Sequence, residues 1–367
     1  MANFSPRKWL VIDTDAGVDD AIAICLALQL LKSPQHSFEL KAITTSFGNC
    51  DCPQVVKNVA KVRAANCMDV STGPNILKGC EDPIKQVRFD ATYFHGRDGL
   101  GDNSYPDENN CHPSNSLHAA DYLLQVCAEV AVNNQAAENQ PIELTLVTLG
   151  PMTNLATALM KDKDAIVSNL SVLVVMGGCG NGRGNQGRTT EFNVAADPEA
   201  AEVVFKALEG STVTTAVLSW ELVFHCTIPW EVFDDFVYSG PGRGNESVAK
   251  ARLRQFLFDV TRAAYGPQMR GEGEMLGGAV VCDMLAVMVA LTVDRRDLAP
   301  GAGTHALVAA HRHVHVEVEL DGRHTRGQTV VDWGCYDGIK REPNCHWITD
   351  LNSAECISMF KDMFAHV

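Results

Sequence analysis

The composition of the chain is that of a soluble globular protein, with 367 residues of which 46% are apolar and 20% are charged. The 45 acidic residues outnumber the 30 basic ones and give a formal net charge of −15. A surface this acidic repels the phosphates of nucleic acids and the head groups of anionic lipids. We therefore expect neither nucleic acid nor a membrane among the partners of the protein.

The amino-terminal segment and the cysteines both indicate a cytoplasmic protein. Near the amino terminus only residues 9–12 are consecutively apolar, which is too short for the core of a signal peptide. The 13 cysteines are odd in number and include no CxxC pair. This pattern is typical of reduced thiols in a large cytosolic chain rather than of a disulfide framework.

Short β-branched runs alternate with helical patterns up to residue 208. A repeated strand and helix predict an α/β fold with a mostly parallel, Rossmann-like open sheet and helices on both faces. After residue 300, alternating residues at 313–320 and 326–333 predict a small antiparallel addition, and a closing helix is expected at 354–364. No segment resembles a linker, so we expect a single domain over residues 1–367. The expected strand and helix pairs are 9–13 with 18–31, 38–46 with 54–64, 143–149 with 153–160, and 170–176 with 198–208.

Four aspartates gather where the first strand passes into the first helix, in the run Asp13-Thr14-Asp15-Ala16-Gly17-Val18-Asp19-Asp20. Their position matters because ligands of open α/β sheets bind beyond the carboxyl ends of the strands. Carboxylates this close repel one another unless they share a cation. Since all the donors are oxygens, with no clustered His or Cys, the pattern favours Ca²⁺ or Mg²⁺ over zinc.

Other kinds of protein also carry clustered aspartates. Caps in the first turn of a helix would explain one or two of the four. An EF-hand loop is excluded, because it requires Gly and Glu where the run from Asp13 places Val18 and Ile24. A haloacid-dehalogenase-type phosphatase also begins with a strand and Asp-x-Asp, but Gly17 stands where that pattern has Thr or Val. Such a phosphatase, using Mg²⁺ and a covalent intermediate on Asp13, is the alternative enzyme.

The run from Asp13 to Asp20 resembles the DxDxGxDD signature of the nucleoside hydrolase family (inosine-uridine preferring nucleoside hydrolase-like ribonucleoside N-ribohydrolases). Enzymes of this family cleave the N-glycosidic bond of ribonucleosides to give ribose and a free purine or pyrimidine base. Further motifs of the family follow in the same order and cover nearly the whole chain. They are 42–49 (AITTSFGN), 93–101 (YFHGRDGLG), 149–156 (LGPMTNLA), 175–178 (VMGG), 191–193 (EFN) and 197–201 (DPEAA).

Cleavage of a ribosyl bond passes through an oxocarbenium-like state. The site must therefore supply an activated water, contacts to the sugar hydroxyls and help for the departing base. A divalent ion can activate and orient the water while a carboxylate takes its proton. The resemblance implies that Asp15 is this base and that the ion is Ca²⁺. The metal ligands that it implies are Asp15, Asp20, Asp283 and the backbone carbonyl of Leu149.

The resemblance also implies a set of contacts to the ribose. Glu191 and Asn193 lie two residues apart, so in an extended segment both side chains point the same way. Asn185 lies upstream in a glycine-rich loop. The residues implied around the sugar are Asp19, Asn49, Met176, Asn185, Glu191 and Asn193.

Two residues concern the departing base. His95 lies among glycines, and the resemblance places it near the base. Cys282 stands before Asp283 and an amphipathic run at 284–291, where many relatives have a histidine that is proposed to protonate the base. A thiol is mostly protonated at neutral pH but is a weak hydrogen-bond donor. Two alternatives remain for the departure of the nucleobase. In the first, the Cys282 thiol donates a proton to it. In the second, Cys282 is a small core residue, and His95, a water or stacking on an aromatic side chain assists the departure. The aromatic candidates are Trp220, Phe224 and Tyr265.

The competing hypothesis is a nucleoside- or ribose-binding protein that has lost turnover through the change at Cys282. Both hypotheses predict calcium-dependent binding, and only the hydrolase predicts release of ribose. The complete set of carboxylates favours the enzyme, because a binding protein needs no general base at Asp15. The resemblance further implies a homodimer or homotetramer.

Three histidines, His311, His313 and His315, alternate with valines near the carboxyl terminus. Alternation places them on one face of a strand, where they could bind a metal. A solvated outer face explains the pattern with fewer assumptions, and it is our prediction for this strand.

Overall fold

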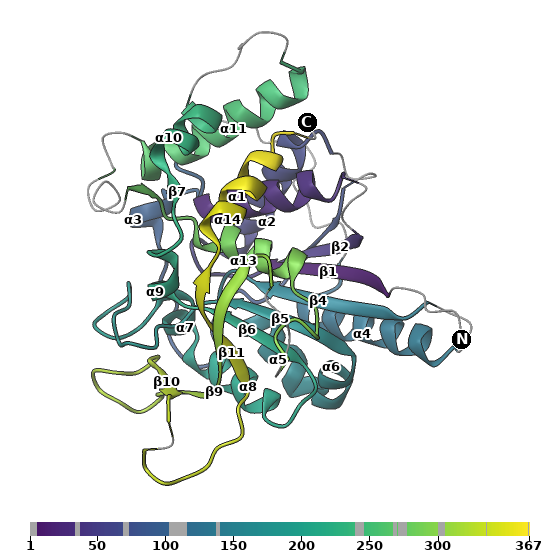
Figure 1. Cartoon of the computed structure of the whole chain (residues 1–367), viewed down its shortest axis with the longest axis vertical. Coiled ribbons are helices and arrows are strands. Elements are labelled where there is room, and N and C mark those ends of the chain that lie inside the picture. The colour runs from purple at the N-terminus through teal and green to yellow at the C-terminus, as the bar shows by residue number, and fades with distance from the viewer. Residues whose placement is uncertain are drawn as a thin grey trace.

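The computed structural model of the chain describes residues 6–33, 37–68, 73–102, 116–136, 140–238, 246–266, 270, 277–299, 305–334, 336–365 and 367. Its centre is a sheet of nine strands in the order β10-β9-β11-β6-β5-β4-β1-β2-β3 (Figure 1). All neighbouring strands from β11 to β3 pair in parallel, whereas β9 and β10 extend the β11 edge with antiparallel pairing. The predicted α/β fold, mostly parallel with a small antiparallel addition near the carboxyl terminus, is therefore confirmed.

The elements predicted from the sequence are all present, with ends shifted by a few residues. The strands of the main sheet are β1 (Arg7–Thr14), β2 (Phe38–Thr45), β3 (Asn75–Lys78), β4 (Ile142–Thr148), β5 (Leu170–Met176), β6 (Thr214–Leu218), β9 (Val308–Val318), β10 (Thr329–Asp332) and β11 (Cys345–Leu351), and a separate short sheet pairs β7 (Ile228–Pro229) with β8 (Gly278–Ala279). The helices are α1 (Val18–Leu30), α2 (Cys52–Ala65), α3 (Thr92–His95), α4 (Ala119–Gln135), α5 (Thr153–Lys161), α6 (Lys163–Asn169), α7 (Phe192–Ala196), α8 (Pro198–Leu208), α9 (Trp220–Val223), α10 (Trp230–Phe233), the π-helical turn η1 (Asp234–Tyr238), α11 (Val248–Tyr265), α13 (Cys282–Thr292) and α14 (Ser353–Asp362). Within the described ranges, no helix combines the length and apolarity that crossing a bilayer requires.

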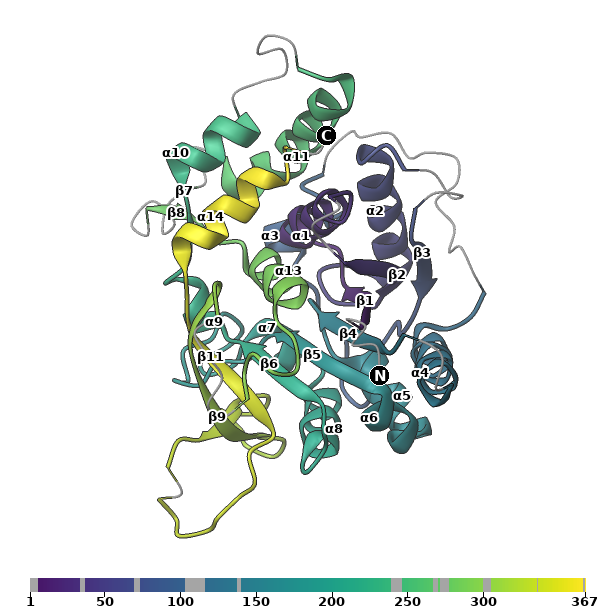
Figure 2. The ribbon, with the colours of Figure 1, turned by 45° about the vertical axis from the view of Figure 1, so that its right-hand side comes forward.

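Both faces of the sheet are covered by helices, and this explains why its central strands are apolar. Every residue of β5 is buried, a pattern typical of parallel strands that are covered on both sides. One apolar core packs α1, α2, α11, α13 and α14 against one face, and a second packs α4, α5, α6 and α8 against the other (Figure 2). Because helices close both faces, a ligand can approach the central strands only at their ends.

Helix α13 differs from the sequence prediction. The sequence predicts an amphipathic run at 284–291, but every residue from Cys282 to Leu291 is buried. The helix packs against α1 and α14 and against the strands β4 and β5. The amphipathic prediction is wrong because a helix that is enclosed on all sides is apolar on all sides.

The outer strand β9 differs from its prediction in one respect. It begins at Val308, earlier than expected, and pairs with both β10 and β11. His313 is exposed and His311 is half-buried, but His315 is only 7% exposed. Its Nδ1 lies 2.8 Å from the carbonyl oxygen of Glu342. A fully solvated histidine face is therefore wrong at His315, because the segment before β11 covers it.

Candidate active site

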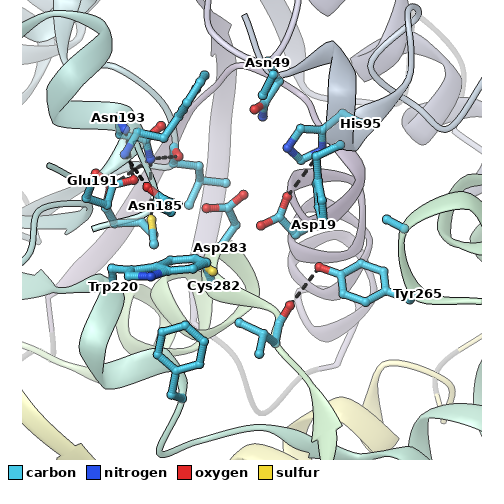
Figure 3. A pocket seen from close by; sticks show the side chains of 18 of the residues that line it. Asp19, Asn49, His95, Asn185, Glu191, Asn193, Trp220, Tyr265, Cys282 and Asp283 are labelled. Carbon is cyan, nitrogen blue, oxygen red and sulfur yellow. Dashed lines mark hydrogen bonds and ion pairs between the residues drawn. The ribbon is translucent and has the colours of Figure 1, made fainter. Parts of the chain in front are cut away.

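A cavity of about 490 Å³ lies beyond the carboxyl ends of β1, β2, β4 and β5 (Figure 3). Ten of the twelve residues that the sequence assigned to the site line this cavity, and the other two, Asp15 and Asp20, are fully buried beside it. These ten come from segments far apart in the sequence, which the parallel strands bring to one edge of the sheet. They are Asp19, Asn49, His95, Leu149, Met176, Asn185, Glu191, Asn193, Cys282 and Asp283.

The turn between β1 and α1 holds its aspartates through local hydrogen bonds. Thr14 Oγ1 donates to one oxygen of Asp20, and the Gly17 N–H donates to the other at 2.8 Å. Between them Ala16 adopts a φ of +35°, a left-handed conformation that a residue with a Cβ rarely adopts. Such strain is commonly retained at functional sites. Asp15 and Asp20 lie close together on the two sides of this turn, since Asn49 Nδ2 donates to both, at 3.0 and 3.1 Å.

The Asp15 carboxylate is closely surrounded by Asn49 and by the backbone at Gly48 and Gly150. Its two carboxylate oxygens accept hydrogen bonds from Asn49, one from the backbone N–H at 2.9 Å and one from Nδ2 at 3.0 Å. A Cβ added at Gly48 would lie 1.9 Å from Asp15 Oδ2, and one at Gly150 would lie 2.8 Å from its Cγ. These two glycines are therefore required for the carboxylate to fit.

Three carboxylates form what we call the acidic cluster: Asp19, Asp20 and Asp283. One oxygen from each lies within 4.8 Å of the others. Figure 3 shows the side chains of Asp19 and Asp283 pointing toward each other in the middle of the cavity. Carboxyl groups in such contact must share a proton or a cation.

The electrostatics of the acidic cluster point to a cation. Burial, followed by repulsion from Asp20, raises the pKa of Asp19 to about 7. Burial and the neighbouring aspartates also hold the pKa values of Asp15 and Asp283 well above their usual range. Among the described residues no Lys or Arg forms an ion pair with the cluster. Buried oxygen donors with uncompensated negative charge suit a hard divalent cation.

His95 does not supply the missing positive charge. Its Nδ1 lies 4.0 Å from Asp19 Oδ1, but burial lowers the pKa of His95 to about 3. The same Nδ1 accepts a hydrogen bond from the backbone N–H of Val18 at 3.0 Å. The ring is therefore neutral, with its proton on Nε2. Figure 3 places it beside Asp19 and Asn49 at the edge of the cavity.

Amide and carboxylate side chains form a second polar wall. Asn193 Nδ2 donates to the carbonyl oxygens of Leu149 at 2.7 Å and Met176 at 3.1 Å, which joins the ends of β4 and β5. Glu191 accepts the backbone N–H groups of Gly178 and Asn193, at 2.8 and 2.9 Å. Burial raises the pKa of Glu191 to about 7.

The segment around Glu191 is not extended as the sequence predicts. Glu191 is itself the N-cap of α7, and Asn193 lies in the first turn of that helix. The prediction of an extended segment is wrong because the Glu191 carboxylate captures the free N–H groups of a new helix. Both side chains still line the cavity. Asn185 lines it as well, and its Oδ1 accepts the backbone N–H of Phe192 at 2.8 Å.

Cys282 begins α13 and is 6% exposed. Burial and the nearby acidic groups hold the pKa of its thiol well above the usual range, so the sulfur keeps its proton at neutral pH. Among the described residues none forms a hydrogen bond with its Sγ. Cys282 is thus a small, apolar part of the wall, next to Trp220 in Figure 3.

Residues 10–358 match the family described as inosine-uridine preferring nucleoside hydrolase. The chain is 29% identical to the enzyme of that name from Crithidia fasciculata over 341 residues, which covers 93% of this chain and 91% of the relative. It is 33% identical to uridine nucleosidase 1 of Arabidopsis thaliana over 69% of this chain and 67% of that protein. The solved structure of an inosine-guanosine nucleoside hydrolase superposes with a TM-score of 0.79 and 29% identity, over 98% of this chain and 99% of that one.

The chain belongs to the inosine-uridine preferring nucleoside hydrolase family. It is therefore an N-glycosyl hydrolase that acts on ribonucleosides. The alternative of a haloacid-dehalogenase-type phosphatase is wrong. Its nucleophile would be Asp13, but that side chain is 1% exposed, does not line the cavity and accepts hydrogen bonds from Thr44 and Asn154.

Aromatic side chains form half of the cavity wall, and the sequence predicted only some of them. Besides Trp220, Phe224 and Tyr265, the wall includes Phe94 and Trp230. Trp220 could be found from the sequence because it follows the end of β6, where ligands of parallel sheets bind. The contribution of Trp230 could not be found, because it depends on how α10 packs against η1 and the short sheet of β7 and β8. Arg270, also missed, stacks over the Trp230 ring at 4.2 Å and forms an ion pair with Asp234.

Proposed function

We propose that the protein is a Ca²⁺-dependent ribonucleoside hydrolase whose acidic cluster lies where the sugar binds. The observation that carries the proposal is the composition of the cavity. Amide and carboxyl side chains line one half of the cavity and aromatic rings line the other, and the buried carboxylates of the acidic cluster lie between them (Figure 3). A volume of about 490 Å³ falls within the range of small-molecule sites. A polar ribose and a flat base match these two halves.

The calcium site would be formed by Asp15, Asp20, Asp283 and the carbonyl oxygen of Leu149, with Asp19 beside them. Oxygen donors in a buried, negatively charged group support a hard cation. When bound, Ca²⁺ would lower the pKa of the attacking water and orient it. The carbonyl of Leu149 is held in place by Asn193, so the same amide supports the metal site and the sugar site.

Asp15 is the proposed general base. Its raised pKa supports this role, because a carboxylate that holds a proton more readily is a better acceptor. Asn49 lines the cavity and bonds both oxygens of Asp15, so it connects the base to the substrate. Asp19 is the alternative general base, because its pKa is raised to about 7 and its side chain lines the cavity.

The polar wall would hold the ribose. The amide and carboxyl groups of Asn49, Asn185, Glu191 and Asn193 can pair with sugar hydroxyls, and their hydrogen bonds to the backbone fix their orientation in advance.

The departing base would lie against Trp220 and Tyr265. His95 carries its proton on Nε2, which makes it a better hydrogen-bond donor to a base than the Cys282 thiol. We therefore assign no proton-transfer role to Cys282.

The experiment is to measure reducing-sugar release from inosine, uridine, adenosine, guanosine and cytidine, with added Ca²⁺ or with EDTA. The unmodified protein is compared with Asp15→Asn, with Asp19→Asn and with the exposed control Asp82→Asn. We expect release that EDTA and Asp15→Asn abolish and that Asp82→Asn does not change. If Asp15→Asn keeps its activity and Asp19→Asn loses it, Asp19 rather than Asp15 is the general base.

A negative result has a defined meaning as well. No ribose from any nucleoside, with calcium-dependent nucleoside binding intact in calorimetry, would refute turnover and support the binding protein.

We also propose that the protein assembles as a homodimer or homotetramer and that it is cytoplasmic. They are supported by the family resemblance and by the cysteine pattern, and light scattering on the purified protein tests the assembly.

A further inference from the structure

Three histidines that the hydrolase site does not use gather on the outer strands of the sheet. His313 in β9 lies directly opposite His346 in β11, and His311 lies two residues before His313 in β9. We call His311, His313 and His346 the histidine cluster. None of them lines the active-site cavity. His346 is the second residue of β11 and pairs with Ala216 in the middle of β6, whereas the active site lies beyond the carboxyl ends of the parallel strands.

The three imidazoles contact one another closely. Nδ1 of His346 lies 3.4 Å from Nδ1 of His311, and the two rings meet edge to face. The ring of His313 stacks on that of His346, with centroids 4.4 Å apart and an angle of 8° between planes. Within the described ranges, no other group forms a hydrogen bond or an ion pair with the three side chains. The cluster therefore consists of nitrogen donors alone.

The protonation state of the cluster leaves lone pairs available. Burial and repulsion from the two other rings lower the pKa of His346 to about 4, and burial also lowers the pKa values of His311 and His313. The three rings are therefore neutral at pH 7. A neutral imidazole is the form that binds metals.

The spacing of the two Nδ1 atoms matches a metal site. Zinc binds histidine nitrogen at about 2.0–2.1 Å in tetrahedral geometry, which separates two ligand atoms by about 3.4 Å. The observed separation is 3.4 Å. Imidazole donors select zinc, nickel, copper or cobalt, whereas the carboxylates of the active site select hard ions such as calcium.

We propose that the histidine cluster binds one divalent transition-metal ion of the zinc class through Nδ1 of His311 and Nδ1 of His346. His313 is exposed and supplies a third nitrogen after rotation of its side chain, and water completes the coordination. The ion joins β9 to β11 at the edge of the sheet. This site is separate from the proposed calcium site and does not depend on the hydrolase mechanism.

The test uses the full chain without an affinity tag, in excess Ca²⁺ so that the acidic cluster is occupied by its own ion if it binds one. Zn²⁺ is titrated by calorimetry, and Co²⁺ by its visible absorption, which reports nitrogen ligands in tetrahedral geometry. The variants are His311→Gln and His346→Gln. The matched control is His324→Gln, an exposed histidine outside the cluster.

We expect one equivalent of Zn²⁺ to bind the unmodified protein and the His324→Gln control. The affinity should fall at least tenfold in His311→Gln, with the Co²⁺ absorption lost. Because His346 is buried, its variant is interpreted only if its circular dichroism matches that of the unmodified protein. Equal Zn²⁺ binding by His311→Gln and the unmodified protein would overturn the proposal, as would no binding by the unmodified protein. Ribose release should be unchanged in His311→Gln, which keeps this result independent of the hydrolase test.

Discussion

Replacing Asp19 with asparagine removes one charge from the acidic cluster and leaves the size of the side chain unchanged. The pKa of this carboxyl rises from its ordinary value of 3.8 to about 7, first because of burial and then because of repulsion from Asp20. A carboxyl with a raised pKa destabilises the fold wherever it is ionised in the unfolded chain. The cost is therefore full above pH 7 and disappears as the pH falls toward 4.

The size of the effect follows from the shift. At about 1.4 kcal/mol for each pKa unit, ionised Asp19 costs the metal-free fold about 4 kcal/mol at pH 7 and about 2 kcal/mol at pH 5. Asp19→Asn should therefore be more stable than the unmodified protein in EDTA, by up to these amounts. Urea unfolding at the two pH values measures the difference. Asp82→Asn, at an exposed position, should change the free energy of unfolding by less than about 0.5 kcal/mol.

Calcium should narrow the difference in stability between Asp19→Asn and the unmodified protein. A ligand at 100 times its dissociation constant stabilises the fold by about 2.7 kcal/mol, and a cluster with one charge fewer binds the ion more weakly. Asp19→Asn should then gain less from added Ca²⁺ than the unmodified protein gains. The reasoning is refuted if Asp19→Asn is no more stable than the unmodified protein in EDTA at pH 7, or if its advantage is the same at pH 5.

Three further substitutions test other parts of the site. Trp220→Ala should lower kcat/KM for nucleosides roughly 5- to 150-fold in steady-state assays, because stacking on a base contributes about 1–3 kcal/mol; an unchanged value would remove Trp220 from the base site. Cys282→Ala should change kcat less than about threefold, because a buried thiol without a hydrogen bond cannot supply the 10²–10⁴-fold effect of a general acid; a hundredfold loss would contradict this. Asn193→Ala should lower the free energy of unfolding by about 1–3 kcal/mol in urea, because the buried carbonyls of Leu149 and Met176 lose their donor; equal stability would mean that water replaces the amide.

The sequence anticipated the architecture because its signals are local. Alternation of β-branched runs with helical patterns is visible within single segments, and it predicted the strand and helix pairs to within a few residues. It failed where tertiary contacts override local pattern. The run at 284–291 is enclosed by other elements rather than amphipathic, and Glu191 starts a helix through its own carboxylate.

The candidate site divides in the same way. Four of the eight residues from Asp13 to Asp20 are aspartates at the end of a strand, so the sequence by itself located an acidic edge of the sheet and predicted a cation there. The order of the remaining motifs supplied the polar residues through family resemblance. Asn49, Leu149 and Met176 meet at the cavity because the parallel strands β2, β4 and β5 end at one edge of the sheet.

Only the tertiary structure decided the rest. It grouped Asp19 with Asp20 and Asp283, and it covered Asp15 with Asn49. It also built the aromatic half of the cavity from α9, α10 and α11, and it brought His346 onto His311. These contacts join segments that are distant along the chain, and their geometry depends on how helices and edge strands pack. Periodicity and spacing carry no information about that packing, because they describe only neighbours in sequence.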